Sequence, residues 1–141
     1  MQEKIFEKEL TSNSYAVAVL VVTPTGIPLV RDPKKPKPLY WKLPGGRSEG
    51  NESAKEAAKR EIKEEIGVKL RDEELERVYS EVRGNHEFVL FQVTILHATR
   101  FSSAGNEGEE ISLVLPIDLE KLKDLFPPHR EVLEKIKFIG G

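Results

Sequence analysis

The sequence predicts an α/β fold in which a curved, mixed β-sheet lies between helices. Strand-like segments come first, one long helix follows, and further strands precede two short helices, an order typical of layered α/β domains. Residues 14–23 are apolar almost throughout and rich in β-branched side chains, which predicts a strand covered on both faces. The 141 residues fit one domain, spanning residues 1–141, that can bury a core without disulfides or a structural metal.

The composition narrows the function classes. The chain has no cysteine, which excludes disulfides, zinc–thiolate sites and thiol catalysis, and agrees with a reducing compartment. Residues 1–10 are too charged for a secretory signal, and no apolar run approaches the roughly 20 residues needed to cross a bilayer. With 22 basic and 24 acidic residues, the chain has a net charge of −2, so it has no overall positive charge that would attract nucleic acid. We expect a cytoplasmic protein with neither membrane nor nucleic acid as a partner.

The N-terminal half predicts two strands, a loop and a glycine turn. Turn residues at 24–26 are followed by an apolar stretch at 27–31, which we expect to return as a hairpin. Residues 32–38 (DPKKPKP) cannot form regular structure and predict an exposed loop, either a solvated linker or a basic flap over a polyphosphate. Residues 39–43 are expected to form a short strand leading into Gly45-Gly46.

The C-terminal half predicts a second hairpin, a polar loop, a strand and two short helices. The expected ranges are 75–83 and 87–97 for the hairpin around Gly84-Asn85, 101–110 for the loop, 111–117 for the strand, 118–125 for one helix and 127 to about 137 for the other.

The long helix has clear start and stop signals. Ser53 and Glu56 form a capping-box pattern, and Gly67 is suited to the left-handed residue that ends a helix, leaving about thirteen helical residues between them. Asn51, just before the helix, is expected to adopt a positive φ.

Three glutamates share one face of this helix. At about 100° per residue, Glu61, Glu64 and Glu65 fall on the side of the alanines, whereas Lys55, Lys59 and Lys63 fall on the opposite side. A solvated face with i,i+4 ion pairs is the alternative, but it would interleave the two charges. Carboxylates crowded within one turn repel unless a cation lies among them, and oxygen ligands favour Mg²⁺ or Mn²⁺.

Two neighbouring features suit such a site. Arg60 lies one turn before Glu64 and either holds that carboxylate in place or forms an ordinary surface ion pair. Gly45-Gly46 lets the backbone approach a ligand or fold tightly against the helix.

These residues form a longer pattern that resembles the signature of the Nudix hydrolases. The pattern reads Gly46-x5-Glu52-x7-Arg60-Glu61-Ile62-x-Glu64-Glu65-x-Gly67-Val68, with every defined position filled, and Trp41-x-Leu43-Pro44-Gly45-Gly46 before it also resembles the family. The resemblance implies an α/β/α sandwich with a curved mixed sheet. It also implies Mg²⁺-dependent (or Mn²⁺-dependent) hydrolysis of a nucleoside diphosphate linked to another moiety, and a homodimer as an assembly to test.

The resemblance assigns roles to individual residues. Glu61, Glu64 and Glu65 would bind metal, Arg60 would orient the glutamates, and Glu52, Gly45 and Gly46 would support them. The general base would be Glu61 or Glu64, or would come from the loop at 101–110, whose candidates are Glu107, Glu109 and Glu110. Solvation is the alternative role of that acidic loop. Asn51 departs from the glycine that the family commonly has.

The substrate stays open at this point. Residues 126–130 (FPPHR) resemble the end of the MutT branch, but Arg130 stands where that branch has a base-contacting asparagine, and an arginine offers donors only. Arg47 and Arg130 are candidate substrate contacts. For His86 and His129 we expect a surface role, with phosphate contact as the alternative.

Two other function classes compete with a hydrolase. A non-catalytic nucleotide-sensing module on the same fold would be expected to lack some of the glutamates, and none is missing. A structural protein with a coincidental pattern would not fill so many defined positions.

Overall fold

The structure is a computed structural model that describes residues 14–97, 99–102 and 109–140. Its elements are β1 (Tyr15–Val22), β2 (Ile27–Arg31), β3 (Gly45–Arg47), α2 (Ala54–Ile66), the 3₁₀ turn η1 (Asp72–Glu74), β4 (Glu76–Arg83), β5 (His86–Thr94), β6 (Glu110–Val114), α3 (Pro116–Lys121) and α4 (Pro127–Lys135). None of the helices in this part of the chain has the length and apolar character needed to cross a bilayer.

The main sheet is mixed, as the sequence predicts. Its strand order is β3-β1-β5-β4, with β1 and β5 parallel and the two outer pairings antiparallel. The hairpin of β4 and β5 turns at Gly84-Asn85, where Gly84 has a φ of 61°. This confirms the second hairpin predicted from sequence.

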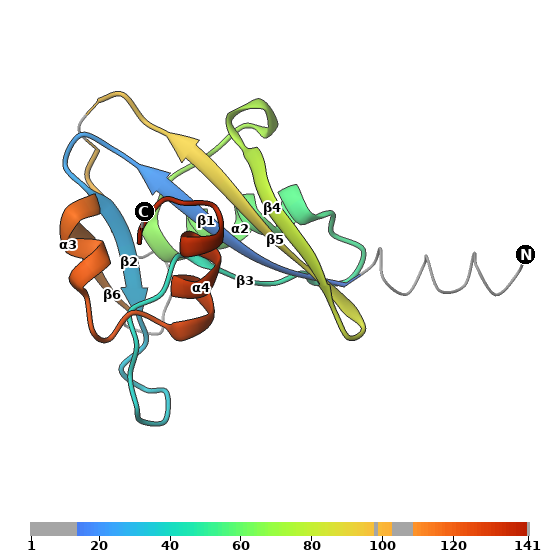
Figure 1. Ribbon diagram of the computed structural model, residues 1–141. Helices are drawn as coiled ribbons and strands as arrows, with labels where there is room; N and C mark the ends of the chain where they lie inside the picture. The colour runs from blue at the N-terminus through green and yellow to red at the C-terminus, as the bar shows by residue number, and fades with distance from the viewer. Residues whose placement is uncertain (1–13, 98, 103–108, 141) are drawn as a thin grey trace, which may run out of the picture.

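Helices cover both faces of this sheet (Figure 1). Alternate residues of β1 and β5 point to opposite sides, so Val19 and Phe91 pack with α2 whereas Leu20 and Leu90 pack with α3 and α4. All four side chains are at most 1% exposed. The fold is therefore the expected mixed α/β arrangement, and its central strand is covered on both faces.

The first predicted hairpin is wrong. The chain does reverse between Thr23 and Gly26, but β2 then leaves the main sheet and pairs with β6 in a separate two-stranded antiparallel sheet. On the edge of β1 opposite β5, it is β3 that pairs, through Ala16, Val17 and Ala18. Local turn chemistry predicted the reversal and could not predict the partner.

Three further expectations need correction. Residues 39–43 form only isolated bridges, at Trp41 and Lys42, and the short strand is Gly45–Arg47 instead. The helix expected at 118–125 is α3, which starts earlier because Pro116 occupies its first turn. The positive φ expected at Asn51 occurs at Gly50, with a φ of 54°.

The long helix agrees with its sequence signals. Ser53 is the N-cap, its side chain accepts from the Glu56 amide, and the Glu56 side chain accepts from the Ser53 amide. Gly67 closes the thirteen-residue helix with a φ of 75°. The inward face is lined by Ala54, Ala57, Ala58, Ile62 and Ile66, all buried.

Candidate functional site

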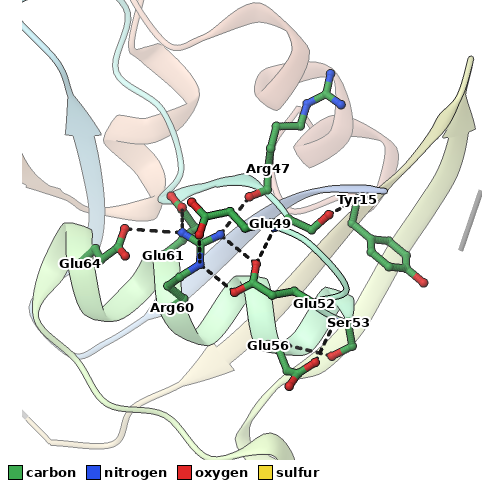
Figure 2. Close-up of polar contacts among 10 residues, drawn as sticks. Tyr15, Arg47, Glu49, Glu52, Ser53, Glu56, Arg60, Glu61 and Glu64 are labelled. Carbon is green, nitrogen blue, oxygen red and sulfur yellow. Dashed lines mark hydrogen bonds and ion pairs between the residues drawn. The ribbon is translucent and has the colours of Figure 1, made fainter. Parts of the chain in front are cut away.

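Arg60 connects the loop before α2 to the carboxylates of the helix (Figure 2). Its guanidinium donates to both oxygens of Glu52, at 2.8 and 3.0 Å, and to Glu61 Oε1 at 2.6 Å. It also donates to the Arg47 carbonyl at 2.9 Å and lies 3.5 Å from Glu64 Oε2. Because it is only 21% exposed and bonded on several sides, Arg60 fixes the rotamer of Glu61.

The two glycines of the turn have different contacts. A Cβ on Gly46 would lie 2.6 Å from Glu61 Oε2, so the absence of a side chain leaves space for that carboxylate. The Gly45 amide donates to Glu65 Oε1 at 2.6 Å, while a Cβ on Gly45 would meet the Val17 carbonyl at 2.0 Å. The turn is thus packed between β1 and the acidic face of α2.

The carboxylates of this face destabilise one another's ionised forms. Burial raises the pKa of Glu65 to about 9, against the opposing effect of the Gly45 amide, and the carboxyls of Glu109 and Glu61 add to the increase. Burial also raises the pKa of Glu61, although the Arg60 guanidinium opposes it. In contrast, the Arg60 hydrogen bonds lower the pKa of Glu52. Among the described residues, no positively charged side chain contributes to the pKa of Glu65.

Glu64 is the most exposed of the three glutamates, with 54% of its side chain accessible. Glu61, by comparison, is 15% exposed. Among the described residues, no three carboxylate or imidazole side chains converge on one point in the conformations they adopt. Glu61 is turned toward Arg60 and Glu65 toward the Gly45 amide, so coordination of one ion would require these side chains to rotate.

A pocket of about 300 Å³ opens beside the glycine turn, between β3 and the start of α4. We call it the β3–α4 pocket. Ala16 and Phe88 contribute to it from the sheet, Gly45 and Gly46 from the turn, and His129 from α4. Because Gly46 also adjoins Glu61, one end of this pocket lies next to the acidic face of α2.

The remaining predicted site residues lie in several places. Arg47 lines the β3–α4 pocket. Arg130 donates to the carbonyls of Glu120 and Leu122, so it joins α4 to α3. Glu110 pairs with Arg31 at 2.9 Å.

Of the acidic-loop candidates, Glu109 is the one that affects the site. Its carboxyl contributes to the raised pKa of Glu65. Glu107 lies outside the described residues.

The surface role expected for His129 is wrong. Its Nδ1 accepts the Leu43 amide at 3.1 Å, and its ring meets Phe126 edge-on at 5.0 Å. Burial lowers its pKa to about 3, with contributions from Lys42 and Arg83. The sequence placed this histidine near a helix start but gave no signal that it joins α4 to the segment before the glycine turn.

Comparison with known proteins agrees with this fold. The NUDIX domain model matches residues 13–136. A structure from work on MutT of Aliivibrio salmonicida and Vibrio cholerae is similar with a TM-score of 0.72 and 23% identity, covering 87% of this chain and 95% of that one. A MutT NUDIX hydrolase from Burkholderia pseudomallei has a TM-score of 0.65 and 20% identity, covering 87% and 97%.

A bifunctional NMN adenylyltransferase/ADP ribose pyrophosphatase from Francisella tularensis is also similar, with a TM-score of 0.68 and 20% identity, over 96% of this chain and 46% of that one. At these identities the structural likeness concerns the fold. A comparison with curated proteins gave no significant match. Since the NUDIX model spans most of the chain and the signature residues surround one glycine turn, the protein belongs to the Nudix hydrolase family.

Proposed function

We propose that this protein is a metal-dependent hydrolase that cleaves a phosphoanhydride bond in a nucleoside diphosphate linked to another moiety, such as a nucleoside triphosphate. One observation carries the proposal. Glu61 and Glu65 lie against Gly46 and Gly45, and the same two glycines line a pocket of about 300 Å³. Carboxylates for metal and a cavity for an organic group thus adjoin one another.

The donor set suits a hard divalent cation, Mg²⁺ or Mn²⁺. Glu61, Glu64 and Glu65 offer oxygen ligands only. The raised pKa of Glu65 indicates a buried carboxyl that nearby positive charge does not stabilise, and a bound cation would supply that charge. When bound, the ion would neutralise charge on the phosphate oxygens and lower the pKa of the attacking water.

The residues of the chain would hold this arrangement in place. Arg60 would keep Glu61 oriented and tie it to Glu52, and the Gly45 amide would fix Glu65. The proton of the attacking water would pass to a carboxylate. Glu61 and Glu64 are the candidates on the helix. Glu107, Glu109 and Glu110 are the candidates from the acidic loop, and of these Glu109 adds to the raised pKa of Glu65.

The decisive experiment is a substrate panel with Mg²⁺ or Mn²⁺. Nucleoside triphosphates, nucleotide sugars, ADP-ribose and dinucleoside polyphosphates would be incubated with the protein, and products separated by ion-exchange chromatography. We expect turnover that EDTA abolishes. Glu64→Gln and Glu65→Gln should each reduce kcat by at least ten- to a hundredfold, as roughly expected for loss of a metal-site residue. Glu76→Gln, an exposed change on β4, is the matched control.

Two results would count against this proposal. Near wild-type activity in Glu64→Gln or Glu65→Gln would remove the metal-ligand roles. Nucleotide binding with no turnover across the panel would favour a sensor. A pH–rate profile of Glu109→Gln would test the loop carboxylate as the base, since loss of the base removes its pKa from the acidic limb, whereas Glu61→Gln and Glu64→Gln also change the metal site.

A further inference from the structure

The polar side chains that line the β3–α4 pocket carry nitrogen atoms and no oxygen atoms. Lys42, Arg47 and Arg83 line it together with the imidazoles of His86 and His129. Within the described residues, its lining includes no carboxylate, amide or hydroxyl side chain. Lysine and arginine can only donate hydrogen bonds, so the pocket offers side-chain donors almost exclusively.

His129 is held as one of these donors. Its Nδ1 is occupied by the Leu43 amide at 3.1 Å, so the neutral ring carries its proton on Nε2. Every fully buried side-chain nitrogen or oxygen in the described chain has a hydrogen-bond partner. Nε2 makes no hydrogen bond to the described protein atoms, so it is not fully buried. It therefore retains access to the pocket that His129 lines.

The charge of the pocket is not balanced from within. Arg83 pairs with Glu81 at 2.9 Å and stacks on the Phe88 ring at 4.3 Å. Lys42 and Arg47, however, have no carboxylate within 4.0 Å in the part of the chain that is described. Two cations therefore face a concave, partly aromatic cavity without a protein counter-charge.

Such a cavity favours negatively charged oxygen over a neutral group. Concave walls of low polarity focus the field of like charges, and charge-assisted hydrogen bonds to anionic oxygen are the stronger ones. An uncharged sugar or nucleobase in the pocket would leave Lys42 and Arg47 without an anionic partner. An amino group on such a ligand would meet the donors of these side chains and could not accept a hydrogen bond from them.

We propose that the substrate group held in the β3–α4 pocket carries its own anionic substituent, a phosphate monoester or a carboxylate separate from the anhydride that is cleaved. This inference rests on the proposed function, because the pocket adjoins the acidic face through Gly46. It deepens that function by naming a substrate class, phosphorylated or carboxylated conjugates of a nucleoside diphosphate.

Pairs of compounds that differ in one anionic group test the inference. Coenzyme A against dephospho-coenzyme A, and NADPH against NADH, probe a phosphate monoester. UDP-glucuronate against UDP-glucose probes a carboxylate. We expect at least one member with the additional anionic group to have a kcat/KM about tenfold above the partner that lacks this group, as for one charge-assisted contact, and to lose that advantage as salt is raised.

Variants that remove a positive charge test whether the preference for the additional anionic group arises in the β3–α4 pocket. In Lys42→Gln and Arg47→Gln, the ratio of kcat/KM between the two members of the preferred pair should fall toward one. Lys123→Gln, which removes an exposed lysine outside the pocket, should leave the ratio as in the wild type. A preference that persists in both pocket variants would overturn the assignment of these residues.

Binding separates this inference from the proposed function. Titration calorimetry would measure the Kd values of two pairs of ligands. One pair is adenosine 3′,5′-bisphosphate and AMP, and the other is glucuronate 1-phosphate and glucose 1-phosphate. None of these contains the phosphoanhydride bond that the proposed reaction cleaves. Equal Kd values within both pairs, or equal kcat/KM within every substrate pair, would refute the anionic pocket even if the anhydrides are cleaved. Tighter binding of an anionic member without any cleavage would support the pocket and refute the proposed hydrolase.

Discussion

The raised pKa of Glu65 predicts an unusual pH dependence for the metal-free protein. The folded state keeps this proton up to about pH 9, whereas the unfolded chain loses it near pH 4.5, the ordinary pKa of a glutamate. Between these values the folded state binds more protons, so its free energy of unfolding falls as pH rises. From pH 7 to 8.5 this one carboxyl should cost about 2 kcal/mol, at roughly 1.4 kcal/mol for each pH unit well below its pKa.

The assay is urea unfolding in EDTA at several pH values, for the wild type and Glu65→Gln. Glutamine keeps the shape of the side chain and can still accept the Gly45 amide, but it does not titrate. The variant should therefore lose about 2 kcal/mol less than the wild type over this range. Glu76→Gln should follow the wild type. Equal losses in wild type and Glu65→Gln would show that Glu65 is already ionised in the folded state.

The other predictions concern the neighbours of this carboxyl. Gly46→Ala should reduce kcat by at least about tenfold with little loss of stability, because the new Cβ displaces the Glu61 carboxylate. Enzyme kinetics and thermal melting of the same variant would show whether kcat falls while the melting temperature is unchanged. Arg60→Lys should also reduce kcat, since a lysine cannot replace the forked contacts, and unchanged kinetics would contradict its positioning role. His129→Phe should lower the free energy of unfolding by about 1–3 kcal/mol because the Leu43 amide loses its acceptor, which urea unfolding at pH 7 measures against wild type.

Much of the fold could be predicted because its signals are local. The capping box at Ser53, the closing Gly67 and the apolar run at 14–23 each depend on a few adjacent residues, and each agrees with the structure. The partner of β2 could not be predicted, because strand pairing here joins segments that are far apart in the sequence. Nothing near residues 27–31 indicates that β6, eighty residues later, would pair with them.

The site shows the same limit. Helical periodicity was enough to put Glu61 and Glu65 on the inward side with the alanines, but it grouped the more exposed Glu64 with them. The contacts of Arg60 to Glu52 and to the Arg47 carbonyl come from a loop that folds back over the helix. The pocket combines four segments that are distant in the sequence, so no spacing in the sequence could reveal it.

The parallel pairing of β1 with β5 has a consequence for synthesis of the chain. Tyr15 pairs with Glu87 and Val22 with Thr94, and everything that builds the acidic helix lies between these strands in the sequence. During translation, α2 can form its hydrogen bonds early, but its alanine face cannot be fully covered until β5 has left the ribosome. Complete burial of the inward face of α2 therefore follows the synthesis of β5, whereas the contacts of the glycine turn with β1 and α2 use only earlier residues.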